Sequence, residues 1–278
     1  MTNNPGPSGS MASNSGPPSP GDPGLSSSLL SLRGISKNFG AVQAVQDINL
    51  DILPGKVTAL LGDNGAGKSV LIKTISGIWA PSSGQMYWNG QEVHVHTPRD
   101  AEHLGIATVY QDLALCDNLD IVQNMFLGHE ETKVGLLDEI NMELTTKQTL
   151  ADLSVSTVKS VRQLVGSLSG GQRQAIAVAR AVMRDSQLVI MDEPTAALGV
   201  SQTAQVLSLI KRLAERGIAV LVISHNLNDV FQVADRAAVM YLGSLVSSGP
   251  IANYDTSSAV ELITTGESSR VPSTSVAS

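Results

Sequence analysis

The feature that most constrains the fold is the stretch "GDNGAGKS" at residues 62–69. It follows the apolar run "VTALL" at 57–61 and precedes the helical pattern "VLIKTISG". Three glycines in this stretch permit a tight loop whose N–H groups point inward. A buried strand, such a loop and a helix in this order form the context in which G-x-x-x-x-G-K-[ST] cradles phosphate groups. The sequence therefore predicts an α/β domain with a phosphate-binding loop. The alternative is a glycine-rich turn that binds nothing.

The loop supplies a set of expected ligand contacts. Lys68 has the position that reaches the β- and γ-phosphates of a nucleotide, and the Ser69 hydroxyl has the position that ligates Mg²⁺. ATP and Mg²⁺ are therefore the expected ligands. The expected nucleotide contacts in and next to the loop are Gly62, Asp63, Asn64, Gly65, Ala66, Gly67, Lys68, Ser69 and Val70.

Two further apolar runs resemble fully buried parallel strands: "QLVIMD" at 187–192 and "IAVLVIS" at 218–224. The first ends in Asp192 and is followed by Glu193. Asp192 is placed to hold Mg²⁺, and Glu193 is the candidate general base for an attacking water. The alternative, two solvated turn residues, leaves unexplained why they end a wholly apolar strand.

The other segments predict the layers around these strands. "LLSLRGISKNF" and "VQDINLDI" alternate polar and apolar residues, as antiparallel strands covered on one face do. "SQTAQVLSLIKRLAERG" predicts a helix that buries Val206, Ile210 and Leu213 and stops at Gly217. From about Leu113 to Gly166 strand patterns vanish. "DIVQNMFLG" and "EINMELTTKQTLADL" there predict a helical insert between two halves of the sheet.

Composition limits the partners and the domain count. A net charge of −7 and a pI near 5.2 argue against nucleic acid as a partner. No apolar run approaches the roughly 18 residues that a membrane span needs. The single cysteine, Cys116, excludes an internal disulfide and is expected to be a packing residue. Residues 1–27 and 267–278 are too rich in Pro, Gly, Ser and other small or polar residues to bury a core and are predicted to be disordered, which leaves 28–266 as one domain.

The stretch "SLSGGQRQAIAVAR" at 167–180 contains no residue for acid–base or metal chemistry. Ser169 is the expected N-cap of a helix, and Gly170 and Gly171 leave the N–H groups of its first turn uncovered. A helix start of this kind favours an anion. The sequence of this segment does not say which anion it binds.

The order of these segments carries a family resemblance. The phosphate loop, "VYQD" with Gln111, "LSGGQ" at 168–172, "VIMDEP" and "ISHN" with His225 resemble the nucleotide-binding subunits of ATP-binding cassette (ABC) transporters. The resemblance covers roughly Leu30 to Gly266. It implies an α/β P-loop NTPase core of ABC type with an antiparallel β subdomain and a helical subdomain at about 113–166 that continues into the "LSGGQ" helix. It also implies that two copies pair head to tail. In such a pair, ATP held by one chain is contacted by the other chain through Ser169, Gly170, Gly171 and Gln172.

The resemblance assigns the remaining site residues by position. Phe39 lies 29 residues before Lys68, where the family places an aromatic ring that stacks on adenine. Gln111 would contact Mg²⁺ or the attacking water and relay the nucleotide state to membrane subunits. His225 would hydrogen-bond the γ-phosphate. Without the motif order these three would be a core Phe, a surface Gln and a structural His. His94 and His96 share one strand face but lack a third metal ligand, so we expect surface residues.

The residues within the motifs indicate the class of transporter. "GDNGAGKS", "VYQDLAL" and "EPTAALG" look most like cassettes that energise bacterial importers of ribose, xylose or fructose. The resemblance implies an ATPase at the cytoplasmic face of the membrane. Its partners would be a second copy, permease subunits and, indirectly, an extracytoplasmic sugar-binding protein. An exporter ATPase and a soluble non-transport ABC protein are the alternatives. Two positions depart from the family pattern. Gly199 stands where many members have Asp, and Val70 stands where most have a hydroxyl residue that touches the α-phosphate.

Overall fold

The strand before the phosphate loop lies inside a ten-stranded sheet of order β5-β4-β1-β2-β12-β11-β3-β10-β9-β6. The computed structural model describes residues 27–155 and 157–271, and the tails predicted to be disordered lie largely outside these residues. The strands of the sheet are β1 Leu30–Phe39, β2 Val42–Ile52, β3 Val57–Leu61, β4 Ser83–Trp88, β5 Gln91–Val93, β6 Ile106–Val109, β9 Leu188–Asp192, β10 Ala219–Ile223, β11 Arg236–Tyr241 and β12 Ser244–Pro250.

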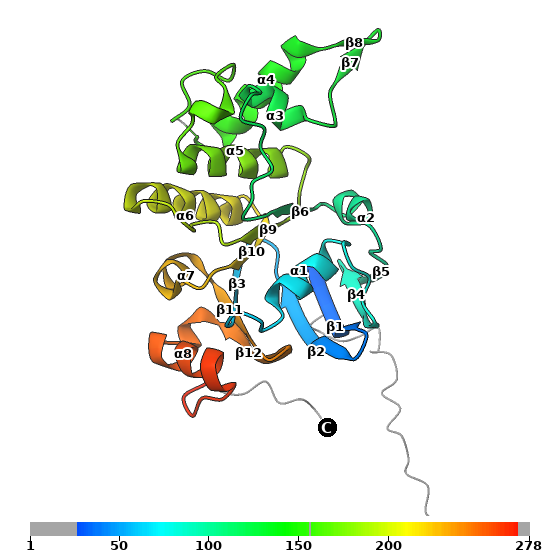
Figure 1. Cartoon of the computed structure of the whole chain (residues 1–278), viewed down its shortest axis with the longest axis vertical. Helices are drawn as coiled ribbons and strands as arrows, with labels where there is room; N and C mark the ends of the chain where they lie inside the picture. Colours follow the sequence, from blue (N-terminus) through cyan, green and yellow to red (C-terminus); the bar gives the residue numbers. More distant parts are fainter. Residues whose placement is uncertain (1–26, 156, 272–278) are drawn as a thin grey trace, which may run out of the picture.

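The helices cover this sheet and extend it at one end (Figure 1). Helices α3, α4 and α5 form the upper part of Figure 1, beyond β6, and α6, α7 and α8 follow one another beside the sheet. The helices are α1 Lys68–Ile75, α2 Pro98–His103, α3 Ile121–Phe126, α4 Glu139–Asp152, α5 Gly170–Val182, α6 Val200–Glu215, α7 Leu227–Val233 and α8 Thr256–Thr265, with 3₁₀ turns at Val165–Ser167 and Ile251–Asn253.

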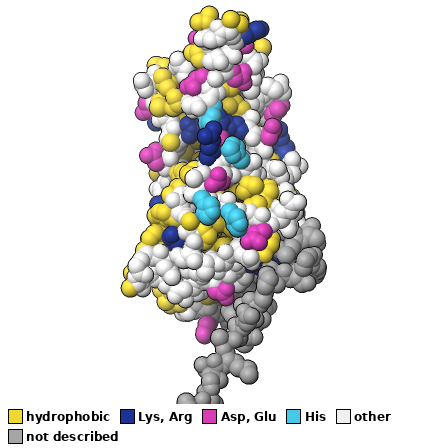
Figure 2. Space-filling view, turned by 90° about the vertical axis from the view of Figure 1, so that its right-hand side faces the viewer, with side chains coloured by type: hydrophobic (Ala, Val, Ile, Leu, Met, Phe, Trp, Pro, Cys, Tyr) yellow, Lys and Arg dark blue, Asp and Glu magenta, His cyan; other side chains and the backbone are white. Residues whose placement is uncertain are grey.

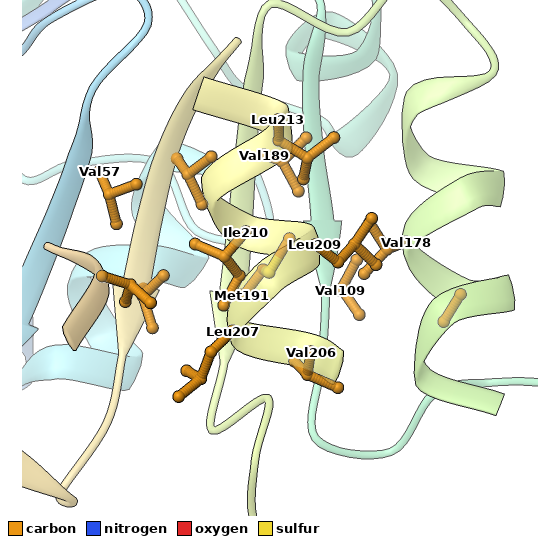
Figure 3. Packing of buried hydrophobic residues seen from close by; sticks show 14 of the residues in the cluster. Val57, Val109, Val178, Val189, Met191, Val206, Leu207, Leu209, Ile210 and Leu213 are labelled. Carbon is orange, nitrogen blue, oxygen red and sulfur yellow. The ribbon is translucent and has the colours of Figure 1, made fainter. Parts of the chain in front are cut away.

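The central strands are parallel, as their apolar sequences predict. Val220 of β10 pairs with Val57 of β3 on one side and with Val189 of β9 on the other. Because successive side chains of a strand point to opposite faces, the parallel strands contribute to two separate hydrophobic clusters. Figure 3 shows one of them, in which α6 places Ile210 and Leu213 against the sheet. The predicted buried face of this helix is confirmed, and Gly217 follows its end with a φ of +88°.

The other cluster joins the central strands to an antiparallel layer. β1 and β2 pair antiparallel from Leu30 opposite Ile52, and β4 and β5 continue the layer. A single residue pair, Ser244 opposite Gln46, connects it to the parallel strands through β12. Helix α1 packs Leu71, Ile72 and Ile75 into this cluster. The predicted antiparallel subdomain is therefore confirmed.

The insert between β6 and β9 is helical, with one exception. α3 and α4 occupy the predicted segments. The expectation that strands are absent from about Leu113 to Gly166 is wrong, because β7 Thr132–Lys133 and β8 Leu136–Leu137 form a small hairpin. Two-residue strands are too short to show an alternating pattern in sequence. Within residues 27–155 and 157–271, no helix combines the length and the apolar character that crossing a membrane requires.

Candidate functional site

The phosphate loop connects the end of β3 to the start of α1 and is organised around Lys68. The Lys68 ammonium donates to the carbonyl oxygens of Gly62 at 2.7 Å and Asp63 at 2.9 Å. Burial lowers the pKa of Lys68, and the charges of Glu193, Asp63 and Asp192 oppose this shift. The loop thus holds a half-buried cation on two of its own carbonyl oxygens, near three acidic side chains.

Two glycines are required by this loop geometry. Gly62 has a φ of +152°, and a Cβ atom there would lie 2.6 Å from the carbonyl oxygen of Met240. Gly67, the N-cap of α1, has a φ of +97°, and its Cβ would lie 2.7 Å from the carbonyl oxygen of Ala44. Side chains at these positions would displace backbone atoms, so the loop depends on glycine for its close packing.

The two carboxylates predicted at the end of β9 occupy different environments. Asp192 is the last residue of the strand, and burial followed by the neighbouring Glu193 charge raises its pKa. Glu193 has a φ of +49°, and its N–H donates to the carbonyl oxygen of Ile223 at 2.9 Å. A left-handed φ is costly for a residue with a Cβ and is found mainly where the surrounding structure fixes it. The backbone therefore turns at Glu193, directly after the last residue of the strand.

That carboxylate is paired with His225. Nδ1 of His225 lies 2.9 Å from Oε2 of Glu193. The imidazole is 75% exposed, whereas the Glu193 side chain is 17% exposed. The sequence places both residues at strand ends, but it contains no signal for this direct contact. The pair leaves Nε2 of His225 available to a ligand.

The strand order explains why these residues meet. β3, β6, β9 and β10 are parallel neighbours, so their carboxyl ends lie at one edge of the sheet. Lys68 and Ser69 follow β3, and Gln111 follows β6. Asp192 ends β9, Glu193 follows it, and His225 follows β10. Ligand sites of open α/β sheets form at this edge. The structure thus brings the predicted residues of one chain's phosphate site to the same edge.

The donor set fits the expected ligands. Among the described residues, no group of three or more His, Cys, Asp and Glu side chains forms a metal site. A site made by the Ser69 hydroxyl, the Asp192 carboxylate and the Gln111 amide provides only a few oxygen donors. This is how proteins hold Mg²⁺ when substrate phosphates and waters complete its coordination.

Phe39 ends β1 with a partly exposed ring. Its side chain is 42% exposed, and its ring meets that of Trp79 edge to face, with centroids 4.8 Å apart and planes at 77°. The Lys37 ammonium lies 5.2 Å from the Phe39 centroid. Phe39 is therefore not a core residue, and the stacking role remains a prediction.

The predicted anion site at α5 has the expected cap. The Gln172 N–H donates to Ser169 Oγ at 3.3 Å, and the Ser169 N–H donates to Gln172 Oε1 at 2.9 Å. The N–H groups of Gly170 and Gly171 have no hydrogen-bond partner among the described residues. Within the described part of one chain, no hydrogen bond or ion pair joins this helix start to Lys68. In a single chain the start of α5 and the phosphate loop are therefore separate, with α5 above β6 and α1 below it in Figure 1.

Comparisons with known proteins identify relatives of this chain among ATP-binding proteins of ABC transporters. Residues 45–196 match the model of the ABC transporter family. The fructose import ATP-binding protein of Rhizobium meliloti is 43% identical over 85% of this chain and 94% of that protein. The xylose/arabinose import ATP-binding protein of Sulfolobus acidocaldarius is 45% identical over 79% of this chain and 87% of its own length. A ribose import ATP-binding protein of Rubrobacter xylanophilus is 38% identical over 84% of this chain but only 47% of its own length.

Solved structures agree. The ADP conformation of an ATP-binding cassette of an ABC transporter has a TM-score of 0.72 at 26% identity, covering 84% of this chain and 94% of that chain. The residues matched by the family model include Lys68, Asp192 and Glu193. The chain belongs to the ABC transporter family, as one of its ATP-binding, ATP-hydrolysing cassettes.

Proposed function

We propose that this cassette hydrolyses ATP to ADP and phosphate in order to energise import of a monosaccharide through separate permease subunits. The observation that carries the ATPase chemistry is the Glu193–His225 pair at the sheet edge that also holds Lys68. The import direction and the sugar class are supported by the fructose, xylose/arabinose and ribose import proteins among its relatives.

The chemistry follows from the positions of the site residues. The Lys68 ammonium exchanges its two carbonyl partners for phosphate oxygens, which gives a better-matched counter-charge. Glu193 accepts the proton of the attacking water. His225 donates from Nδ1 to that carboxylate and from Nε2 to the γ-phosphate, two bonds that together require the imidazolium form, because a neutral ring carries only one N–H.

The metal is held by few groups of this chain. Ser69 and Asp192 would be its ligands, with Gln111 contacting the metal or the attacking water. Bound Mg²⁺ supplies charge neutralisation at the β- and γ-phosphates. Phe39 presents its exposed ring to the adenine.

Two copies complete the site. Ser169 and the free N–H groups of Gly170 and Gly171 provide anion donors that have no phosphate in their own chain. Pairing two chains head to tail places them on the γ-phosphate bound at the partner's loop. The relationship to a cassette solved as a dimer, in its ADP- and phosphate-bound state, supports this assembly.

The permease docks at the cleft beside Gln111. This cleft of about 460 Å³ runs between β6 and helices α2, α3 and α5, and it includes Tyr110 and Asp112, which flank Gln111. Glu102, Arg180 and Arg184 also line it. The face that carries α2 and β5 gathers basic and histidine side chains in Figure 2. A permease segment there would contact Tyr110 and Asp112, the two residues next to Gln111 in the chain, at the cytoplasmic face of the membrane. The sugar-binding protein would act only through the permease.

Replacement of the base tests the ATPase assignment. Glu193→Gln should keep ATP binding, lower turnover by about 10²–10⁴-fold, and accumulate an ATP-bound dimer. Turnover assays and size-exclusion chromatography with ATP measure both effects. The exposed Glu215 on α6 provides the matched control, since Glu215→Gln should leave turnover unchanged. A Glu193→Gln chain that turns over like wild type would refute the assignment.

Reconstitution tests the substrate class. The chain would be co-purified with the permease encoded beside its gene and placed in liposomes. Addition of the sugar-binding protein loaded with fructose, ribose or xylose should stimulate ATP hydrolysis. Stimulation by a non-sugar ligand, or export of substrate from the liposomes, would refute monosaccharide import while leaving the ATPase assignment intact.

A further inference from the structure

The segment after Gln111 is joined to the segment before Ser169 by backbone hydrogen bonds. The N–H of Gly166 donates to the carbonyl oxygen of Asp117 at 2.9 Å, and the N–H of Val165 donates to that of Leu119 at 3.0 Å. A Cβ atom at Gly166 would lie 2.9 Å from the Asp117 oxygen, so glycine permits this approach. Residues 117–119 and 165–166 therefore form one hydrogen-bonded unit.

A single guanidinium ties this unit to the start of α5. Nε of Arg173 donates to the carbonyl oxygen of Leu168 at 3.2 Å, and its NH2 donates to that of Gly166 at 2.9 Å. Its NH1 lies 3.3 Å from Oδ1 of Asp117. Arg173 thus contacts the residue immediately before Ser169 and the segment that follows Gln111. Lysine has one ammonium and cannot hold three acceptors in this planar arrangement.

The same unit is also anchored by a buried side-chain amide. Asn124 is 0% exposed. Its Oδ1 accepts from the N–H of Cys116 at 2.7 Å, and its Nδ2 donates to the carbonyl oxygens of Cys116, Leu119 and Asp120. The segment that pairs with Arg173 is therefore also fixed by Asn124. A fixed supporting segment keeps the side chains bonded to it in a defined position.

We propose that Arg173 is a positioning residue for Ser169, and that its ion pair with Asp117 links this position to the segment that follows Gln111. The inference rests on the proposed function, in which Ser169 contacts ATP bound to the partner chain. Arg173 holds the backbone at 166–168 through two carbonyl oxygens. This backbone sets the direction of the Ser169 hydroxyl and of the free N–H groups that follow it. Loss of these contacts should misplace the anion donors while leaving the chain's own phosphate loop intact.

Heterodimers of two variant chains test this proposal, because Arg173 can be changed either in the chain that supplies Ser169 to the working site or in the other chain. The reference mixture combines a Ser169→Arg chain with a Lys68→Ala chain. Each homodimer is inactive, and the heterodimer has one working site, made from Lys68 of the first chain and Ser169 of the second. Arg173→Lys is then added either to the Lys68→Ala chain, which supplies the working Ser169, or to the Ser169→Arg chain, which does not.

We expect ATP hydrolysis to fall by between about tenfold and 10²-fold in the first arrangement, since ångström-scale misplacement has effects of this size. The second arrangement should match the reference. ATP binding by each separate chain should stay unchanged. Asp117→Asn should likewise lower ATP hydrolysis only in the chain that supplies Ser169, and by a smaller factor. It also serves as the second variant if Arg173→Lys does not fold.

Arg162 provides the matched control. It lies on the same helical subdomain and pairs with Glu139, Glu143 and Asp120, but it does not contact residues 166–168. Arg162→Lys in the chain that supplies Ser169 should leave hydrolysis at the reference level. A loss that is equal in both Arg173 arrangements, as a merely structural role would give, or absent from both, would overturn the inference alone. A reference mixture without activity, despite heterodimer formation, would overturn the head-to-tail arrangement and the inference with it.

Discussion

Asp192 shows how a site residue lowers the stability of its own fold. Its carboxylate is half-buried at the end of β9, where burial and the Glu193 charge raise its pKa above the ordinary value of 3.8. A raised pKa means that the folded chain binds the proton more tightly than the unfolded chain does. Ionisation of Asp192 therefore costs stability, and this cost grows as pH rises from the ordinary value of 3.8 through the raised pKa. Mg²⁺ and nucleotide restore the missing counter-charge only when they bind.

Asp192→Asn should therefore stabilise the nucleotide-free chain while removing its ATPase activity. At pH 7, without Mg²⁺, we expect a rise in Tm of about 2–4 °C, the effect of on the order of 1 kcal/mol. The gain should shrink as pH falls toward 4, because Asp192 then becomes protonated. Thermal unfolding across this pH range measures it, with the exposed Glu215→Gln as control. An equal or lower Tm at pH 7 would contradict the burial argument.

Val70 is the position where this loop departs from its family. The side chain is half-buried and packs against the cluster that contains α1. Threonine has nearly the same shape but adds one donor for the α-phosphate, and a hydrogen bond to a charged group contributes about 1.5–3 kcal/mol. Rehydration of the phosphate in an open cassette reduces this gain to roughly tenfold in affinity or less.

Val70→Thr should thus tighten ATP binding several-fold and change the saturated rate little, because Glu193 is untouched. Stability should fall slightly, since a hydroxyl replaces a packed methyl group. Titration calorimetry on both forms tests the affinity. Equal or weaker binding by the threonine form would mean that the α-phosphate is held without this position.

At the scale of elements, the start of α5 has two roles that can be separated. Ser169 caps the helix through its hydroxyl and also faces the proposed phosphate. Ser169→Ala removes the cap, at a cost of about 0.5–2 kcal/mol, whereas aspartate is an equally good cap. Aspartate, however, places a negative charge where the γ-phosphate would lie.

We expect Ser169→Asp to unfold near the wild-type temperature yet lose ATP hydrolysis almost completely. Ser169→Ala should unfold at a lower temperature but keep part of its turnover, because the free amides of Gly170 and Gly171 remain. Thermal unfolding and turnover assays on both variants separate the roles. If activity followed stability in the two variants, the phosphate role of Ser169 would be refuted.

Elements were predictable from sequence where one physical pattern dominates. The apolar strands β3, β9 and β10 are buried on both faces, so their sequences alone indicate parallel strands. Helix α6 shows the 3.6-residue period of one buried face. The order of these elements then places Lys68 and Glu193 at a common edge without any knowledge of side-chain geometry.

Contacts between residues distant in sequence were not predictable. The Glu193–His225 pair depends on the left-handed φ of Glu193, which no residue type at that position indicates. The contacts of Arg173 depend on two loops that meet only in the folded chain. The hairpin β7–β8 is too short to have a period. In each case the information lies in tertiary packing rather than in local preference.

At the scale of the whole molecule, the same sheet contributes side chains to both hydrophobic clusters. The alternating side chains of β3, β9 and β10 contribute to both clusters, with α6 covering one face and α1 the other. Neither cluster can lose its packing without exposing the reverse face of the same strands. This predicts one cooperative unfolding transition for the described domain, although its antiparallel and helical parts lie at opposite ends.

Truncation of each core separately tests this cooperativity. Ile210 on α6 and Ile75 on α1 are both 0% exposed, and they belong to different clusters. Ile210→Ala and Ile75→Ala should each lower the free energy of unfolding by about 2–5 kcal/mol. Each should move a single urea transition, in which far-UV circular dichroism coincides with tryptophan fluorescence, to which Trp88 of the α1 cluster and Trp79 contribute. Val200, 91% exposed at the start of α6, supplies the control, and Val200→Ala should change stability by less than about 0.5 kcal/mol. Two separate transitions, each shifted by only one of the isoleucine variants, would show that the two cores unfold independently.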